Sequence, residues 1–351
     1  MTATRVAAFD CGTNSLRLLI ADVEDGRLVD VLRRTELVRL GHGVDRTGRF
    51  DPEALARTLA VTREYAELVR EAGAERVRFV ATSATRDAAD REDFLGSVER
   101  IIGVRPETIS GEEEAALSFR GALSAVDAPR PVLVVDLGGG STELVLGGAE
   151  KTVPLGGAEK TVPLGGAEKT VPLGGAEKTV PLGGAERTVR LGGAEPEQAH
   201  SMDVGSVRLT ERHRAGGGAP TAEQRAAIRA DVRRALAASP VDLSAARSVV
   251  GVAATVLTVT AHVLRLEAYD RDALEATLPL RDVLAACDEL AALSPAATAA
   301  LPYVRAGRED VLGAGAAIWS EVLRAVQDAS PAVTTVTTTA HDILDGLALH
   351  L

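Results

Sequence analysis

The chain has 351 residues, a formal net charge of −11 and 46% hydrophobic residues, which is enough for two domains with sizeable cores. An acidic chain without a basic tail is not a general nucleic-acid binder. Two cysteines are too few for a disulfide framework, and the N-terminus lacks a signal-peptide pattern. The longest apolar run, 249–264, is too short and too rich in threonine to span a bilayer. We therefore expect a cytoplasmic protein that binds neither nucleic acid nor membrane.

The first part of the chain is predicted to be a three-stranded meander with a polar loop after its first strand. A strand over 6–10 runs into the motif Asp-Cys-Gly-Thr-Asn-Ser at 10–15, and strands over 16–23 and 28–40 follow. The plan of this loop is a strand, an aspartate, one residue, a glycine and small hydroxylic residues. The plan recurs later in the chain.

Helices and strands then alternate, which is typical of an α/β domain with a mixed sheet. Asp51 has the properties of an N-cap for a helix that ends at Gly73. A strand over 76–81 leads into Ala-Thr-Ser-Ala-Thr-Arg at 81–86. A helix over 90–102 and a strand over 104–109 follow.

Three consecutive acids, 112–114, open the next predicted helix. Ser110 and Glu113 have the spacing of a capping box, and acids suit the positive end of a helix dipole. Capping and solvation therefore account for the run without any catalytic role. Glu114 shares a face with Leu117 and Gly121, at the rim of the buried side, and the residues alone leave its role open.

The second polar loop is Asp-Leu-Gly-Gly-Gly-Ser-Thr-Glu at 136–143, between strands over 131–135 and 144–146. Three glycines allow a positive φ and close approach to a ligand. Successive N–H groups in such a turn form a concave anion site, and the flanking acids suit a divalent cation. Two loops of the same plan predict duplicated halves that face a shared cleft.

A nine-residue unit repeats from residue 147 to about 195, and it contains every lysine of the chain. Glycine pairs could join short strands into a meander, whereas the proline in each unit confines it to sheet edges. We favour a mobile loop over an ordered meander and assign the repeat no chemistry.

After the repeat the main body resumes with a strand over 200–204 and the motif Gly-Ser-Val-Arg at 205–208. The remaining expected elements are a helix over 221–238, a strand over 248–252 leading into Ala-Ala-Thr at 253–255, helices over 281–293, 295–301 and 308–326, a strand over 333–337 and a helix over 341–351.

These motifs, in this order, resemble the exopolyphosphatase/guanosine pentaphosphate phosphatase family, within the acetate-kinase, sugar-kinase and actin superfamily. The motifs that carry the resemblance lie at 10–15, 81–86, 109–115, 136–143, 205–211, 251–255 and 341–346. The resemblance implies an α/β fold of two actin-like (ribonuclease H-like) domains, 1–126 and 127–351, with an interdomain cleft. The repeat is an insert in the second domain, and the last helix is a candidate to pack back on the first.

The chain departs from the family pattern at three positions. Asp90 replaces an asparagine, Ala254 a glycine and Ala340 a glutamate. If the backbone at 254 needs a positive φ, alanine costs about 1 kcal/mol there.

The implied function is a phosphohydrolase that removes the terminal phosphate of inorganic polyphosphate, of guanosine pentaphosphate or of both, with water and Mg²⁺. By resemblance Glu114 is the catalytic base, and Asp10, Asp136 and Glu143 are the metal ligands. The expected phosphate-binding residues come from both loops and three arginines: Gly12, Thr13, Asn14, Ser15, Arg17, Arg86, Gly138, Gly139, Gly140, Ser141, Thr142 and Arg208. From the residues alone, Arg17 is equally well explained as a solvated strand arginine.

Two alternatives remain open from the sequence. One is a kinase of a small carboxylate or sugar, against which an acid placed to activate water argues. The other is a nucleotide-binding regulator without turnover. Besides the phosphate substrate, the possible partner is a second copy in a homodimer.

Overall fold

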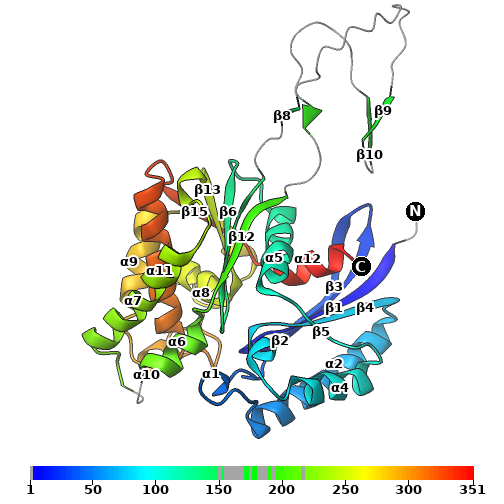
Figure 1. Ribbon diagram of the computed structural model, residues 1–351, viewed down its shortest axis with the longest axis horizontal. Coiled ribbons are helices and arrows are strands. Elements are labelled where there is room, and N and C mark those ends of the chain that lie inside the picture. Colours follow the sequence, from blue (N-terminus) through cyan, green and yellow to red (C-terminus); the bar gives the residue numbers. More distant parts are fainter. Residues whose placement is uncertain are drawn as a thin grey trace, which may run out of the picture.

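The computed structural model describes residues 3–148, 195–214 and 218–351, together with the backbone of four short strands inside the repeat (Figure 1). Those strands are β8 (Thr152–Val153), β9 (Thr170–Leu173), β10 (Ala176–Thr179) and β11 (Val189–Arg190). The rest of the repeat, and with it the choice between a meander and a mobile loop, lies outside the described residues.

The first half of the chain forms a five-stranded sheet in the order β3-β2-β1-β4-β5. Its strands are β1 (Thr4–Cys11), β2 (Ser15–Glu24), β3 (Arg27–Leu37), β4 (Arg76–Ala81) and β5 (Glu107–Thr108). The meander β1–β3 is antiparallel, and β4 and β5 add in parallel beside β1. Helices α2 (Pro52–Ala72) and α4 (Arg91–Ile102) cover one face, over a core that includes Phe9 and Phe79.

The second half forms a six-stranded sheet in the order β12-β7-β6-β13-β15-β14. Its strands are β6 (Val132–Leu137), β7 (Thr142–Gly147), β12 (Pro196–Met202), β13 (Ser248–Val252), β14 (Ala276–Pro279) and β15 (Thr335–Thr338). The helices packed on one face include α7 (Ala222–Ala238), α8 (Ala253–Leu264), α9 (Leu280–Leu290) and α11 (Leu312–Ala329). Shorter helices are α1 (Val44–Thr47), α3 (Ser83–Asp87), α6 (Ser206–His213) and α10 (Pro295–Ala299).

Two helices lie between the sheets and join them (Figure 1). α5 (Gly111–Ala125) packs its apolar face on β6 and β7, whereas α12 (Ile343–Leu349) packs on β1 and β2. The helices touch at glycines, because a Cβ on Gly121 would lie 1.8 Å from the Asp342 carbonyl oxygen and one on Gly346 would lie 2.1 Å from that of Leu117. The last helix of the chain therefore completes the core of the first sheet.

Most expected elements are present, and the differences have local causes. The strand expected over 104–109 shrinks to β5, because Pro106 has no N–H to donate to a sheet. The helix expected from residue 308 begins at Leu312, four residues later, after Gly307 adopts φ +85°. The edge strand β14 was not expected. The domain boundary at 126–127 stays a proposal, and the two sheets lie on either side of it.

The helices of the described residues include none that is both long enough and apolar enough to cross a membrane.

Candidate active site

A cavity of about 340 Å³ lies between the two sheets, where the loop after β1 meets the loop after β6. The structure brings most of the predicted loop residues to its wall: Gly12, Thr13, Asn14, Ser15, Gly138, Gly139, Gly140 and Ser141. Asp10, Asp136, Glu114 and Arg17 also line it. Residues that are more than 120 positions apart in the chain therefore share one site.

The two loops have the same internal hydrogen bond. The Gly12 N–H donates to the Ser15 carbonyl at 3.0 Å, and the Gly138 N–H donates to the Ser141 carbonyl at 3.0 Å. This match supports the duplication that the sequence predicted. The remaining backbone N–H and hydroxyl groups of both loops form a concave surface suited to an anion.

Close packing, and not an unusual backbone conformation, explains the glycines at 139 and 140. Neither Gly12 nor the triplet 138–140 is among the glycines with a positive φ, so that expectation was wrong. A Cβ on Gly140 would lie 2.5 Å from the Thr13 Oγ1 and the Ser83 Oγ. Only a residue without a side chain lets the loop of one half touch the loop of the other.

Four acidic side chains are buried around this contact, namely Asp10, Asp136, Glu143 and Asp342, and a fifth, Glu114, is largely buried. Two arginines offset part of their charge. Arg17 pairs with both Asp10 and Asp342, and Arg86 donates to Glu114 at 2.7 Å. The other two carboxylates have hydroxyl partners, since Ser118 donates to Asp136 and Ser201 donates to Glu143 at 2.7 Å.

Burial of these acids favours their protonated forms. The pKa of Asp136 rises to about 6 because it is buried and lies near the negative charge of Asp342, despite the bonds from Ser118 and the charge of Arg17. Burial also raises the pKa of Asp10, against the opposing effect of Arg17. The pKa of Glu143 is raised by burial and by the charges of Glu114 and Asp136.

The run of acids at the start of α5 is divided between three environments. Ser110 caps the helix by accepting from the Glu113 N–H at 3.1 Å, while the Glu113 side chain points outward to Arg78 at 2.9 Å. Glu112 is exposed. Glu114 turns inward, with 13% of its side chain exposed, and burial raises its pKa to about 7 although Arg86 opposes the shift. Only Glu114 of the three reaches the cavity.

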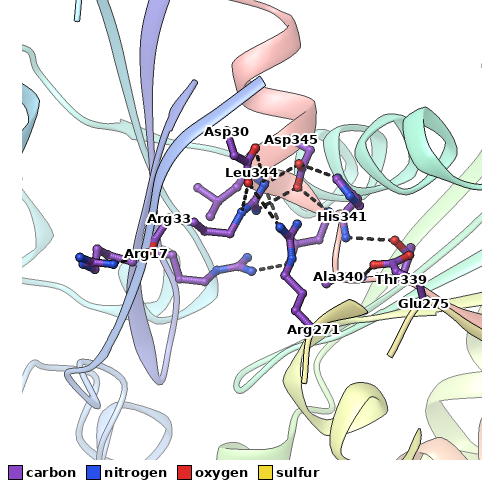
Figure 2. A network of polar contacts seen from close by, with 12 residues as sticks. Arg17, Asp30, Arg33, Arg271, Glu275, Thr339, Ala340, His341, Leu344 and Asp345 are labelled. Carbon is purple, nitrogen blue, oxygen red and sulfur yellow. Dashed lines mark hydrogen bonds and ion pairs between the residues drawn. The ribbon is translucent and has the colours of Figure 1, made fainter. Parts of the chain in front are cut away.

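A network of hydrogen bonds and ion pairs at the start of α12 centres on Asp345 (Figure 2). Asp345 is fully buried and accepts from Arg33 of β3 at 2.7 and 3.1 Å, from His341 at 2.8 Å and from the Asp342 N–H at 3.0 Å. Burial would raise the pKa of Asp345, but His341 and Arg33 hold it below its usual range. The Asp342 carboxylate, anchored in this way, pairs with Arg17.

Four predicted site residues do not line the cavity: Arg86, Thr142, Glu143 and Arg208. Arg86 reaches the site through Glu114, and the Thr142 hydroxyl donates to the Val204 carbonyl at 2.6 Å. Arg208 lies behind the loops and donates to the Gly140 carbonyl at 2.7 Å and to the Ser83 Oγ at 3.1 Å. Because it also pairs with Asp45 and Asp87, it braces the loops from outside.

The structure also describes the surroundings of the residues that depart from the family pattern. The positive φ, +72°, falls on Ala253 and not on Ala254, so the strain lies one residue earlier than expected. Asp90 accepts from the Phe50 N–H at 3.2 Å, and the Ala340 N–H donates to Glu275 at 2.7 Å.

Sequence reasoning missed several residues with large side chains that also line the cavity: Arg33, Tyr269, Arg271, Tyr303, Arg305 and Arg308. The signal available was the pair of arginines at 305 and 308, of which the sequence analysis placed only Arg308 in an element, at the start of a helix.

The donor set fits a divalent cation. No three His, Cys, Asp or Glu side chains of the described residues are grouped as a complete metal site. Mg²⁺, however, commonly takes one or two carboxylates and completes its shell with waters and substrate phosphates. Asp10 and Asp136 line the cavity with hard oxygen donors, and their charge is only partly offset by arginine.

The fold and the cavity together define a class: an α/β protein of two sheets, whose two matching glycine loops face carboxylates across one cavity. The model of the Ppx/GppA phosphatase family matches residues 19–157 and 155–347, and the chain belongs to this family. It is a phosphohydrolase, as the motifs predicted.

Individual relatives agree with this assignment. The chain is 40% identical to a Mycobacterium tuberculosis protein named exopolyphosphatase 2, over 100% of this chain and 99% of that protein. A crystal structure of an exopolyphosphatase-like protein matches with a TM-score of 0.84 and 38% identity, covering 100% and 98% of the two chains. The Aquifex aeolicus member of the family matches with a TM-score of 0.71 and 25% identity, covering 99% and 97%.

Proposed function

We propose that this protein releases the terminal phosphate of inorganic polyphosphate by attack of a water molecule, with Glu114 as the general base. The observation that carries the proposal is the position of Glu114, a largely buried acid in the same cavity as both glycine loops, with a pKa raised to about 7. A base whose pKa lies near the working pH is the most effective one for proton transfer.

The chain's own groups suit each part of the reaction. The N–H and hydroxyl groups of the two loops bind and orient the terminal phosphoryl group. Glu114, held by Arg86, takes the proton from the attacking water as the new P–O bond forms. The bond to the next phosphate then breaks, and the shortened chain leaves with the electron pair.

We propose Mg²⁺ as the cofactor, held by Asp10 and Asp136. When bound, it would offset the charge of the phosphates and of the buried acids. Glu143 is the third predicted ligand. It is 1% exposed, hydrogen-bonded to Ser201 and not among the residues that line the cavity, so we propose that it supports the site without binding the cation directly.

The catalytic assignment is tested by Glu114→Gln, which keeps the shape of the side chain but cannot accept the proton. Turnover on polyphosphate, measured as phosphate release, should fall by a factor of about 10² to 10⁴ while KM changes little. Glu113→Gln is the matched control, and it should keep its turnover and lose at most about 1 kcal/mol of stability, because its ion pair with Arg78 is exposed.

Loss of turnover in the Glu113 variant and not in the Glu114 variant would show that Glu113 is the general base. Full activity in both would refute the mechanism. Addition of ADP, or of a small carboxylate or sugar, should leave phosphate release unchanged, because the acceptor is water and not a kinase substrate.

The homodimer and the cytoplasmic location remain proposals from the sequence. Light scattering of the purified protein and fractionation of cells would test them.

A further inference from the structure

A serine behind the cavity holds one of the acids that line it. Ser118 lies on α5 and is fully buried, and its hydroxyl donates to the Oδ2 of Asp136, near the end of β6. Asp136 lines the cavity, whereas Ser118 does not. Any influence of Ser118 on a bound ligand therefore passes through Asp136.

Burial alone does not explain the direction of this hydroxyl. A serine or threonine inside a helix can donate to the carbonyl four residues earlier in the same helix. In α2, Thr58 donates in this way to the Ala54 carbonyl at 2.7 Å, and Thr62 donates to the Thr58 carbonyl at 2.8 Å. The Glu114 carbonyl stands in the same relation to Ser118. The Ser118 hydroxyl nevertheless leaves its own helix and reaches a strand of the second sheet.

The hydrogen bond from Ser118 leaves the other oxygen of Asp136 free. Within the described parts of the chain, Oδ2 accepts from Ser118 and no group donates to Oδ1. Asp10 is arranged in the same way, since both close contacts from Arg17 are to its Oδ2. Each of the two proposed metal ligands therefore has one oxygen that the protein holds and one that remains for a cation.

Ser118 also lies close to the proposed general base along α5. Glu114 and Ser118 are four residues apart, which is about one turn of an α-helix, so their side chains share a face of α5. Glu114 lines the cavity, so this is the face that α5 turns toward the site. One turn of a single helix therefore presents both the base and the hydroxyl that holds a metal ligand.

We infer that Ser118 is a positioning residue, which fixes the orientation of the Asp136 carboxylate and thereby strengthens the binding of a divalent cation. Carboxylates that ligate a metal are themselves hydrogen-bonded, and loss of such a partner typically costs a factor of roughly 10 to 100 in metal affinity. Without Ser118, the carboxylate turns more freely, and the cation must restrict it on binding. This inference rests on the proposed function, since it concerns the cofactor of the same site.

The experiment measures Mg²⁺ binding without substrate, so that the result does not depend on turnover. A ligand that binds only the folded protein raises its melting temperature by an amount that depends on the ligand concentration and the dissociation constant. Thermal melts of chelator-treated protein over a series of Mg²⁺ concentrations therefore give the dissociation constant of the cation. Phosphate release from polyphosphate over the same series gives the Mg²⁺ concentration for half-maximal turnover.

The test variant is Ser118→Ala, which removes the hydroxyl and adds no atoms to a buried position. Ser124→Ala is the matched control, because this serine lies in the same helix and is exposed, and its hydroxyl donates to the Gly121 carbonyl at 2.7 Å. The two substitutions remove the same group from α5, but only one of them affects a carboxylate of the site.

Ser118→Ala should raise the dissociation constant of Mg²⁺ by a factor of about 10 to 100, and the Mg²⁺ concentration for half-maximal turnover should rise in parallel. At saturating Mg²⁺, kcat and KM for polyphosphate should return to within about threefold of the wild type, because the lost interaction concerns the cation and not the substrate. Ser124→Ala should match the wild type in all of these measurements.

An unchanged dissociation constant in Ser118→Ala would overturn the inference even if the variant melts at a lower temperature, because a purely structural role lowers the melting temperature equally with and without Mg²⁺. A kcat that stays low at saturating Mg²⁺ would also overturn it. A wild type whose melting temperature does not respond to Mg²⁺ would refute the cation site and the inference together. Failure of the proposed function has a different signature, which is a wild type that binds Mg²⁺ but releases no phosphate from polyphosphate.

Discussion

Asp136 shows how one buried carboxylate links stability to pH. Its pKa is about 6 in the folded protein, above the ordinary aspartate value of 3.8. A raised pKa gives stability that is fully present below the unfolded value and is lost as the pH rises through the folded value. Without a cation, the site therefore weakens the protein toward neutral pH.

Asp136→Asn should remove this dependence, since asparagine can still accept from Ser118. Without metal, the free energy of unfolding of the variant should rise relative to that of the wild type by about 2 kcal/mol as the pH rises from 4.5 to 7.5, since part of the pKa shift lies below pH 4.5. Urea unfolding in a chelator at several pH values measures the difference. The exposed Asp328→Asn is the control, and a constant difference between Asp136→Asn and the wild type would contradict the assignment.

Ala253 is a second residue whose local environment lowers the stability of the folded protein. Its φ of +72° is unfavourable for any residue with a Cβ, by about 1 kcal/mol. Ala253→Gly should therefore raise the free energy of unfolding by up to about 1 kcal/mol in urea titrations. Ala254→Gly should lower it by about 0.5–1 kcal/mol, because that residue lies in α8 without a positive φ. The opposite order would place the strain at Ala254.

The loops of the site were predictable from the sequence because glycine, aspartate and hydroxylic residues must follow a strand in a fixed order to build them. Side-chain direction was not. The motif placed Arg208 close to the phosphate loops, but Asp45 and Asp87, which are distant in sequence, draw its guanidinium to the outside. Arg305 and Arg308 were missed because their loop ends in a helix that starts later than its pattern suggests.

The crossing of α5 and α12 is the element that depends most on small residues. A Cβ on Gly121 would meet backbone atoms of Asp342 and Gly346 at 1.8 to 2.9 Å, and a backbone cannot move aside as a side chain can. The crossing also fixes Asp342, and through it Arg17.

Gly121→Ala should therefore destabilise the protein by about 3 kcal/mol or more and reduce turnover, since the helices must separate. Gly96→Ala in α4 is the matched control, because nothing lies within 4 Å of its added Cβ. That variant should gain about 0.5–1 kcal/mol and keep its activity. Thermal melts and phosphate release measure both, and equal behaviour of the two variants would show that the crossing is not tight.

For the molecule as a whole, the repeat is an addition between two paired strands. Gly147 of β7 pairs with Pro196 of β12, so the ends of the insert already lie side by side. Joining Glu150 to Pro196 removes residues 151–195 and leaves a short turn. It also removes the exposed pair between Arg120 and Glu195, which is worth at most about 1 kcal/mol.

The shortened protein should keep its melting temperature within a few degrees and its turnover within about twofold, because closure of a long surface loop costs little entropy per added residue. A deletion variant that fails to fold, or that loses most of its turnover, would show that the repeat supports the sheet or the site.

The position of α12 in the chain also determines when the core of the first sheet can be completed during folding. Leu344 and Leu347 belong to the same apolar cluster as Val6 and Ala8 of β1. The ribosome makes β1 (Thr4–Cys11) long before α12 (Ile343–Leu349). One face of the first sheet therefore stays uncovered during synthesis until α12 has been made and can pack on it.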